Sequence, residues 1–130
     1  MTKIAFFEIE PWEERYIKEH LKKHQLAFFD EELDEKSVRR AKSFDIISVF
    51  VHSEVNSRVI NQLKNTKAIV TRSTGFDHID LKVCKEKGIL VSNTPYYGEN
   101  TVAEYTFALI LGLSRQIPEA LGKTKKKDFS

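Results

Sequence analysis

Short apolar runs recur along this chain at nearly even intervals, and each is almost free of charged residues. The five runs are residues 4–7, 26–29, 46–51, 68–70 and 89–91. Strands that are buried on both faces of a parallel sheet have this composition, because helices cover both sides of such a sheet. The pattern therefore predicts five buried, parallel strands.

Segments with helical spacing lie between these runs. The packing face of the first is formed by Tyr16, Ile17, His20 and Leu21, and that of the third by Val55, Val59, Ile60 and Leu63. The second, near 34–41, is weaker, and the fourth spans 81–87 between a capping Asp80 and a terminating Gly88. Alternating strands and helices with short connections predict an α/β fold, a doubly wound five-stranded parallel sheet in flavodoxin-like order.

The last helical segment is apolar nearly all round. Val102, Leu109 and Leu113 lie on one side, and Phe107 and Leu111 lie on the other. Such a helix must be buried nearly all round, so one side is expected to cover the sheet and the other to meet a partner outside these 130 residues.

Local signals set the expected ends of this helix. Thr101 and Glu104 have the spacing of a capping box, which predicts the start of the helix there. The helical pattern fades after Arg115, through Pro118, into a lysine-rich tail.

Charge and composition narrow the functional classes. The net charge is +2, but residues 123–130 hold four lysines and one aspartate, a local +3, so residues 1–122 sum to −1. The tail is expected to be a solvated linker, and the folded body shows no nucleic-acid face. A single cysteine, Cys84, excludes an internal disulfide, fits a reducing compartment and is expected to be a buried structural thiol. Acidic residues near the start argue against a signal peptide, and the longest apolar segment is too short for a bilayer. These features predict a cytoplasmic protein without a membrane partner.

The main candidate site follows the fourth strand. Ser73, Thr74 and Gly75 lie between that strand and a helix, where free backbone N–H groups and two hydroxyls suit a carboxylate or a phosphate. The loop after the third strand, at His52 and Ser53, is expected to open into the same crevice. Next to this site, Arg72 either guides an anion or forms a surface salt bridge.

Other chemistries lack their residues. The one cysteine and four scattered histidines give no metal-ligand spacing, and neither Gly-x-Gly-x-x-Gly nor a Walker motif is present. A phosphoreceiver domain needs an aspartate at the end of strand three and a lysine near the end of strand five, and both are missing. A flavin-binding flavodoxin needs a phosphate loop after strand one, but residues 7–11 are acidic and would repel phosphate.

Three blocks, in order, resemble the D-isomer-specific 2-hydroxyacid dehydrogenases. They are residues 72–80 (RSTGFDHID), 87–95 (KGILVSNTP) and 100–104 (NTVAE), the last followed by an apolar helix that ends at 113–118 (LSRQIP). The resemblance implies the N-terminal segment of the substrate-binding (catalytic) domain at 1–99, an interdomain helix at 100–117, and a linker at 118–130 toward a Rossmann domain that this chain lacks.

The resemblance also implies roles for individual residues. The backbone around Ser73, Thr74 and Gly75 would hold the substrate carboxylate, and Val51, His52 and Ser53 would line the pocket. Thr74 would approach the nicotinamide of NAD, and the helix that begins at Thr101 would cross to the cofactor domain and form a homodimer. The arginine, histidine and glutamate of the family's catalytic trio would all lie outside this chain.

The expected function is therefore that of a fragment of an NAD-dependent D-2-hydroxyacid dehydrogenase, inactive by itself. Its expected substrates are small 2-oxo and 2-hydroxy acids. The alternative is a stand-alone flavodoxin-like module that binds small anions or a protein partner through the last helix.

Overall fold

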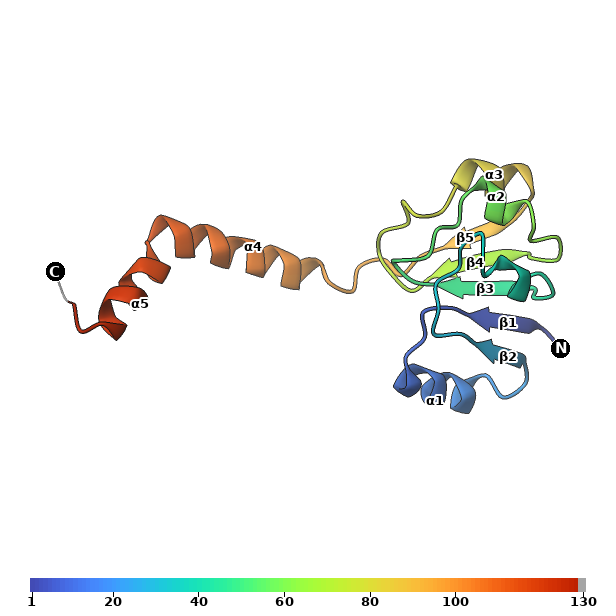
Figure 1. Cartoon of the computed structure of the whole chain (residues 1–130), viewed down its shortest axis with the longest axis horizontal. Helices are drawn as coiled ribbons and strands as arrows, with labels where there is room; N and C mark the ends of the chain where they lie inside the picture. Colours follow the sequence, from blue (N-terminus) through green and yellow to red (C-terminus); the bar gives the residue numbers. More distant parts are fainter. Residues whose placement is uncertain (129–130) are drawn as a thin grey trace. The chain divides into compact units, whose positions relative to one another are not determined.

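The computed structural model describes residues 1–128, which form two compact units, Met1–Pro95 and a second that begins at Tyr96. The first unit contains the five strands β1 (Lys3–Phe6), β2 (Gln25–Phe28), β3 (Ile46–Val49), β4 (Ala68–Thr71) and β5 (Leu90–Ser92). All neighbouring strands are parallel, and their order is β2-β1-β3-β4-β5 (Figure 1). The predicted doubly wound sheet and its flavodoxin-like order are confirmed.

Most strand bounds differ from the prediction by one residue, but β3 is shorter by two. It ends at Val49, whereas the apolar run continues to Val51. The chain turns there because the next amides bind a side chain instead of a neighbouring strand: Phe50 N donates to the carboxylate of Glu8 over 3.0 Å. Val51 is 45% exposed as a result.

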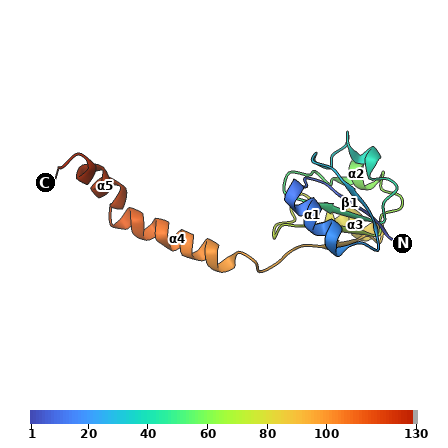
Figure 2. The same cartoon turned by 90° about the horizontal axis from the view of Figure 1, so that it is seen from below.

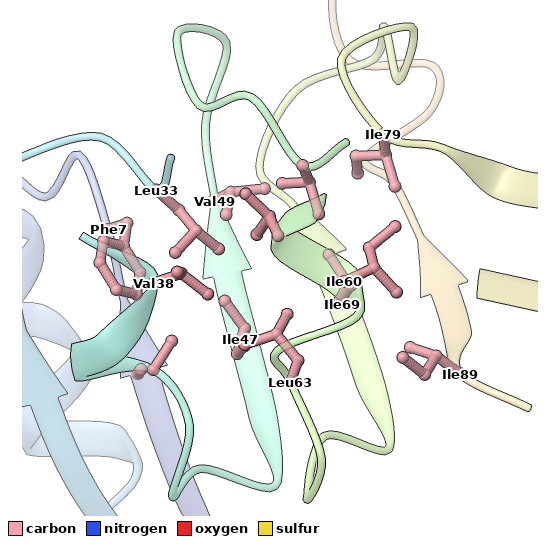
Figure 3. Packing of buried hydrophobic residues seen from close by; sticks show 14 of the residues in the cluster. Phe7, Leu33, Val38, Ile47, Val49, Ile60, Leu63, Ile69, Ile79 and Ile89 are labelled. Carbon is pink, nitrogen blue, oxygen red and sulfur yellow. The ribbon is translucent and has the colours of Figure 1, made fainter. Parts of the chain in front are cut away.

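The larger core cluster lies on one face of the sheet. It joins β1, β3 and β4 to α2 (Ser57–Ile60), α3 (Leu81–Glu86) and the 3-10 helix η1 (Val38–Arg40). Figure 3 shows Ile47 and Ile69 on neighbouring strands, facing Ile60 of α2 and Val38 of η1. These four side chains have at most 1% exposure, so this layer is a closed core.

The opposite face carries α1 (Pro11–His20), seen from a second side in Figure 2. A smaller cluster forms there, in which Ile17 and Leu21 pack on Ile4 and Phe6. Among the described residues this cluster includes none from β4 or β5, and Leu90 is 74% exposed.

Several predicted helices are shorter or face differently in the structure. Tyr16 is 61% exposed and stacks on His20 at 4.1 Å between ring centroids, so the packing face of α1 is narrower than predicted. The segment near 34–41 forms only a 3-10 turn. The third segment contains only a four-residue helix, α2, whose first turn is capped by Asn56.

The ends of α3 follow the prediction. The side chain of Asp80 accepts a hydrogen bond from the Val83 amide over 3.0 Å, which satisfies one free donor of the first turn. Gly88 follows the helix with φ of +67°, the left-handed conformation that glycine adopts at helix ends without steric cost. Both predicted cap residues of this helix are confirmed.

The second unit holds two helices, α4 (Glu99–Ser114) and α5 (Ile117–Lys125), which differ from the prediction at their starts. The predicted capping box at Thr101 does not form, because α4 already begins at Glu99 after Gly98. A second helix, α5, replaces the expected fading pattern, since Pro118 lies in its first turn, where proline favours a helix. Residues 129–130 of the expected linker lie outside the described residues.

Candidate functional site

The candidate site lies at the carboxyl edge of the sheet. The register pairs Phe6 with Ser48 and Val49 with Thr71, so β1, β3 and β4 end side by side. The loops at 50–53 and 72–76 leave the sheet at this edge, where open α/β sheets bind ligands. The structure therefore brings together the two loops that the sequence assigned to the site.

A carboxylate from the end of β1 organises the loop at 50–53. One oxygen of Glu8 accepts the amides of Phe50 and Ser53, each over 3.0 Å, and the other accepts the amide of His52 over 2.8 Å. The Ser53 hydroxyl also donates to this carboxylate. Such convergent amides form an anion-binding nest, which is occupied here by the chain's own side chain.

The three residues predicted in this loop differ in accessibility. Ser53 is 1% exposed, and its hydroxyl oxygen accepts the Leu33 amide over 2.9 Å, so that hydroxyl serves the loop itself. The side chains of Val51 and His52 are exposed at the edge. The predicted lining of a pocket by this loop therefore depends on Val51 and His52.

Arg72 connects the loop at 72–76 to the end of β1. Its guanidinium donates to the carbonyl oxygens of Phe7 and Glu8 over 3.1 Å and 2.6 Å, and to Ser48 Oγ over 3.1 Å. Its Nε lies 3.3 Å from a carboxylate oxygen of Glu13. This arginine is therefore committed to internal contacts, which favours the salt-bridge alternative over the guidance of an anion.

The hydroxyls of the second loop are also bound within the protein. Ser73 is 4% exposed, and its hydroxyl donates to the Gly75 carbonyl over 2.8 Å. The Thr74 hydroxyl donates to the Thr94 carbonyl over 3.0 Å, and the Asn93 side chain donates to the Thr74 carbonyl over 2.9 Å. These bonds attach the loop to the segment after β5 and fix its backbone.

The amides of the same loop are open to a ligand. Across residues 1–128 no partner accepts the backbone N–H of Thr74, Gly75 or Phe76, and all three residues are exposed. A Cβ at Gly75 would lie 3.3 Å from a carboxylate oxygen of Asp77, so the loop is tight on that side. Free amides in a fixed loop suit a carboxylate.

The single cysteine, Cys84, is a buried structural residue. Burial raises the pKa of the Cys84 thiol, helped by the nearby charge of Asp80, so this cysteine is a poor nucleophile. Within the described residues no three His, Cys, Asp or Glu side chains gather as a metal site needs. None of the helices described here has the length and apolar character needed to cross a bilayer.

The sequence interpretation missed the role of Glu8. It took the acidic segment at 7–11 only as a reason against phosphate binding. The sequence could have shown this contact, because β1 neighbours β3 in flavodoxin-like order. A carboxylate directly after β1 therefore lies next to the free amides after β3.

Comparison with known proteins identifies the family. Residues 4–126 match the model of the D-isomer specific 2-hydroxyacid dehydrogenase, catalytic domain. The chain belongs to this family. The predicted assignment to the N-terminal part of this catalytic domain is confirmed.

Relatives of this family cover nearly all of the chain. A 2-hydroxyacid dehydrogenase homolog of Haemophilus influenzae is 33% identical over 98% of this chain and 40% of the relative. The D-lactate dehydrogenase of Escherichia coli is 30% identical over the same shares. The D-lactate dehydrogenase of Aquifex aeolicus, solved as a complex with NAD and lactic acid, matches with a TM-score of 0.88 at 35% identity, over 98% of this chain and 38% of that one. The chain thus spans about two fifths of the length of these relatives.

Proposed function

We propose that this chain is the substrate-binding part of an NAD-dependent oxidoreductase that interconverts a 2-oxo acid and the matching D-2-hydroxy acid. In this reaction the 2-oxo acid takes a hydride from NADH and a proton, which gives the D-2-hydroxy acid and NAD⁺. The loop at 73–76 holds the substrate carboxylate. The family match and the likeness to an enzyme solved with NAD and lactic acid support the proposal.

One observation carries the assignment of the carboxylate site. The amides of Thr74, Gly75 and Phe76, three exposed residues, are unpaired, whereas the amides of Phe50, His52 and Ser53 in the neighbouring loop are already bound to Glu8. A carboxylate that reaches this edge of the sheet therefore finds its free donors at 74–76.

Thr74 of the first unit and Thr101 of the second are each proposed, independently, to contact a nicotinamide cofactor. Thr74 is exposed, and because its hydroxyl donates to Thr94, its oxygen still has lone pairs to accept a hydrogen bond. Thr101 is exposed on α4, in the second unit. Bound NADH would supply the hydride for reduction of the 2-oxo acid, and the chain's own contribution is to bind and orient the acid.

Two partners complete the proposed function. The first is a Rossmann domain of the same protein, since this chain spans about two fifths of its relatives and contains no dinucleotide-binding glycine motif. The second is another copy of the chain, because α4 exposes a large apolar surface. The alternative of a stand-alone module is not better supported, since the family match extends over residues 4–126.

Titration of the ¹⁵N-labelled chain with pyruvate tests the carboxylate site. We expect chemical shift changes that are largest for the amides of Thr74, Gly75 and Phe76. Because the proposed Rossmann domain would supply the rest of the pocket, we expect a weak dissociation constant of about 1–50 mM. Gly75→Val is the matched variant, because its side chain would crowd Asp77 and the approach to the amides. Equal shift changes in this variant, or none at 74–76 in the wild type, would contradict the proposal.

A further inference from the structure

Two sets of backbone donors lie at the same edge of the sheet, and they differ in occupancy. The set at 50–53 surrounds the carboxylate of Glu8, with three amides at 2.8–3.0 Å and one hydroxyl. The set at 74–76 is free. The two loops follow adjacent strands, so a small acid that diffuses to this edge meets both of them.

We propose that Glu8 is a positioning residue for the substrate: its carboxylate fills the anion nest at 50–53, so that a substrate carboxylate binds only at 74–76. The proposal rests on the function proposed above for the second loop. It adds that the first loop is built to hold an anion, and that the protein supplies this anion itself.

The backbone conformation of Glu8 directs its side chain toward the loop at 50–53. Glu8 has φ of +53°, a left-handed conformation that is uncommon for residues other than glycine and costs free energy. Two contacts hold it there: its amide donates to the Glu31 carbonyl over 3.0 Å, and its carbonyl accepts from Arg72 over 2.6 Å. Arg72 directly precedes Ser73, so the same residue fixes both the backbone of Glu8 and the start of the free loop.

The surroundings of Glu8 also disfavour a second anion. A hollow of about 850 Å³ beside it is lined by six carboxylates: Glu8, Glu10, Glu13, Glu14, Asp30 and Glu32. Glu13 is paired with Arg72 and Glu14 with Lys18, whereas the other four form no ion pair with a described basic side chain. These four carboxylates repel an anionic group, so the part of a substrate that faces this side is expected to be uncharged. The substrates inferred here are 2-oxo acids with one carboxylate and a neutral side chain.

Chemical rescue of Glu8→Ala by formate tests the role of Glu8. Removal of the carboxylate leaves the nest empty, and formate has the same charge and acceptor geometry. We expect the Tm of Glu8→Ala to rise by about 4–8 °C at a formate concentration near five times its dissociation constant, relative to chloride of equal ionic strength. The amide signals of Phe50, His52 and Ser53 should return toward their wild-type positions in the same titration.

Glu32→Ala is the matched control, because Glu32 lines the same hollow and its exposed carboxylate makes no contact with another described side chain. Formate that binds at 74–76 should raise the Tm of this variant and of the wild type by the same, smaller amount relative to chloride. No gain in Glu8→Ala beyond these two proteins would overturn the proposal. If Glu8→Ala does not fold in either salt, Glu8→Gln is the second test. The amide proton signals of Phe50, His52 and Ser53 should shift upfield in this variant, because their acceptor is no longer charged. Amide signals at their wild-type positions would refute the role of the Glu8 charge.

A pyruvate titration separates this inference from the proposed function. In the wild type, pyruvate should shift only the amides at 74–76, whereas in Glu8→Ala it should also shift those of Phe50, His52 and Ser53. If these three amides respond in Glu8→Ala but 74–76 never does, the proposed substrate loop is wrong and the nest is confirmed. If 74–76 responds in both proteins and the three amides in neither, the inference about Glu8 is wrong.

Discussion

Two carboxylates hold opposite ends of the central strands. Glu8 organises the carboxyl edge, where the candidate site lies. Asp45 performs the corresponding task at the amino edge, because it accepts the Lys3 amide over 2.9 Å and lies 3.2 Å from the Lys67 ammonium group. The Asp45 side chain thus connects β1 to the starts of β3 and β4 at one end of the sheet, and the Glu8 side chain connects β1 to the loop after β3 at the other.

The contacts of Asp45 predict a pH-dependent stability. The hydrogen bond from the Lys3 amide, with a smaller effect from Lys67, lowers the pKa of Asp45 below its ordinary value of 3.8. The folded state therefore favours the charged form, so this stabilisation is complete above the unfolded pKa and is lost as the pH falls through the lowered one. We expect Asp45→Asn to reduce the Tm at pH 7 by a few °C, on the order of other exposed charge contacts.

Thermal unfolding of Asp45→Asn and wild type between pH 7 and pH 2 measures this effect. The difference in Tm should shrink as the pH falls below about 4. Asp30→Asn is the control, because Asp30 is exposed and has no side-chain partner among the described residues. A difference in Tm that stays constant down to pH 2 would rule out the proposed contribution of the Asp45 charge.

At the scale of elements, burial decided what could be predicted. The five strands and their order followed from short apolar runs, because a strand in the middle of a parallel sheet must be apolar on both faces. The predicted helices between them were less accurate, since the segment 34–41 buries Val38 and Ala41 with a 3-10 turn and needs no regular α-helix. Proline at 118 was taken as an end of helical structure, but in a first turn it begins a helix.

The common position of the two candidate loops was predicted from the sequence, but their internal contacts were not. The topology puts the loops at 50–53 and 73–76 at one edge, and sequence reasoning reached that point. It could not show that the hydroxyls of Ser73 and Thr74 are used internally, because their acceptors, such as the Thr94 carbonyl, come from backbone geometry. Sequence reasoning also could not show that the amides at 50–53 are already hydrogen-bonded, because this depends on where the Glu8 side chain points.

The end of α3 gives a prediction at the scale of elements. Gly88 has φ of +67°, and a Cβ there would meet no atom within 4 Å, so only the backbone conformation opposes a side chain. Gly88→Ala should therefore destabilise the chain by about 1 kcal/mol, and Gly88→Asn by less, because asparagine tolerates the left-handed region. Urea unfolding followed by circular dichroism measures both.

Lys87→Ala is the control for this pair, since Lys87 is exposed and has an ordinary φ of −93°. It should change the free energy of unfolding by no more than about 0.5 kcal/mol. Equal losses for Gly88→Ala and Gly88→Asn would show that the conformation at position 88 is not what limits stability.

At the scale of the whole molecule, we propose that the chain binds the substrate but does not turn it over by itself. The free amides at 74–76 are proposed to hold an acid, the family's catalytic arginine, histidine and glutamate would by resemblance lie outside this chain, and the sequence contains no glycine motif of a dinucleotide loop. We therefore expect no oxidation of NADH by the isolated chain with pyruvate, 2-oxoisocaproate or 3-phosphohydroxypyruvate. Absorbance at the NADH band, with a D-lactate dehydrogenase as positive control, measures this. Turnover above a buffer blank in pure material would refute the claim that the catalytic residues lie outside this chain.

The surface of α4 predicts self-association of the chain. None of its residues is buried, and seven large apolar side chains on both sides are more than half exposed: Val102, Tyr105, Phe107, Leu109, Ile110, Leu111 and Leu113. Burial of each contributes roughly 1.5–3 kcal/mol, which favours a partner for this helix. The simplest arrangement is a two-fold dimer in which two copies of α4 cover each other.

Sedimentation equilibrium across a concentration series tests this dimer. Leu109→Glu should shift the chain toward the monomer by at least tenfold in dissociation constant, because it places a charge in the apolar interface. Asn100→Glu adds the same charge at an exposed polar position of α4 and should leave the association unchanged. A wild-type chain that stays monomeric at high concentration, with α4 still helical by circular dichroism, would show that α4 is covered within the chain. The argument for a partner at this helix would then lose its physical basis.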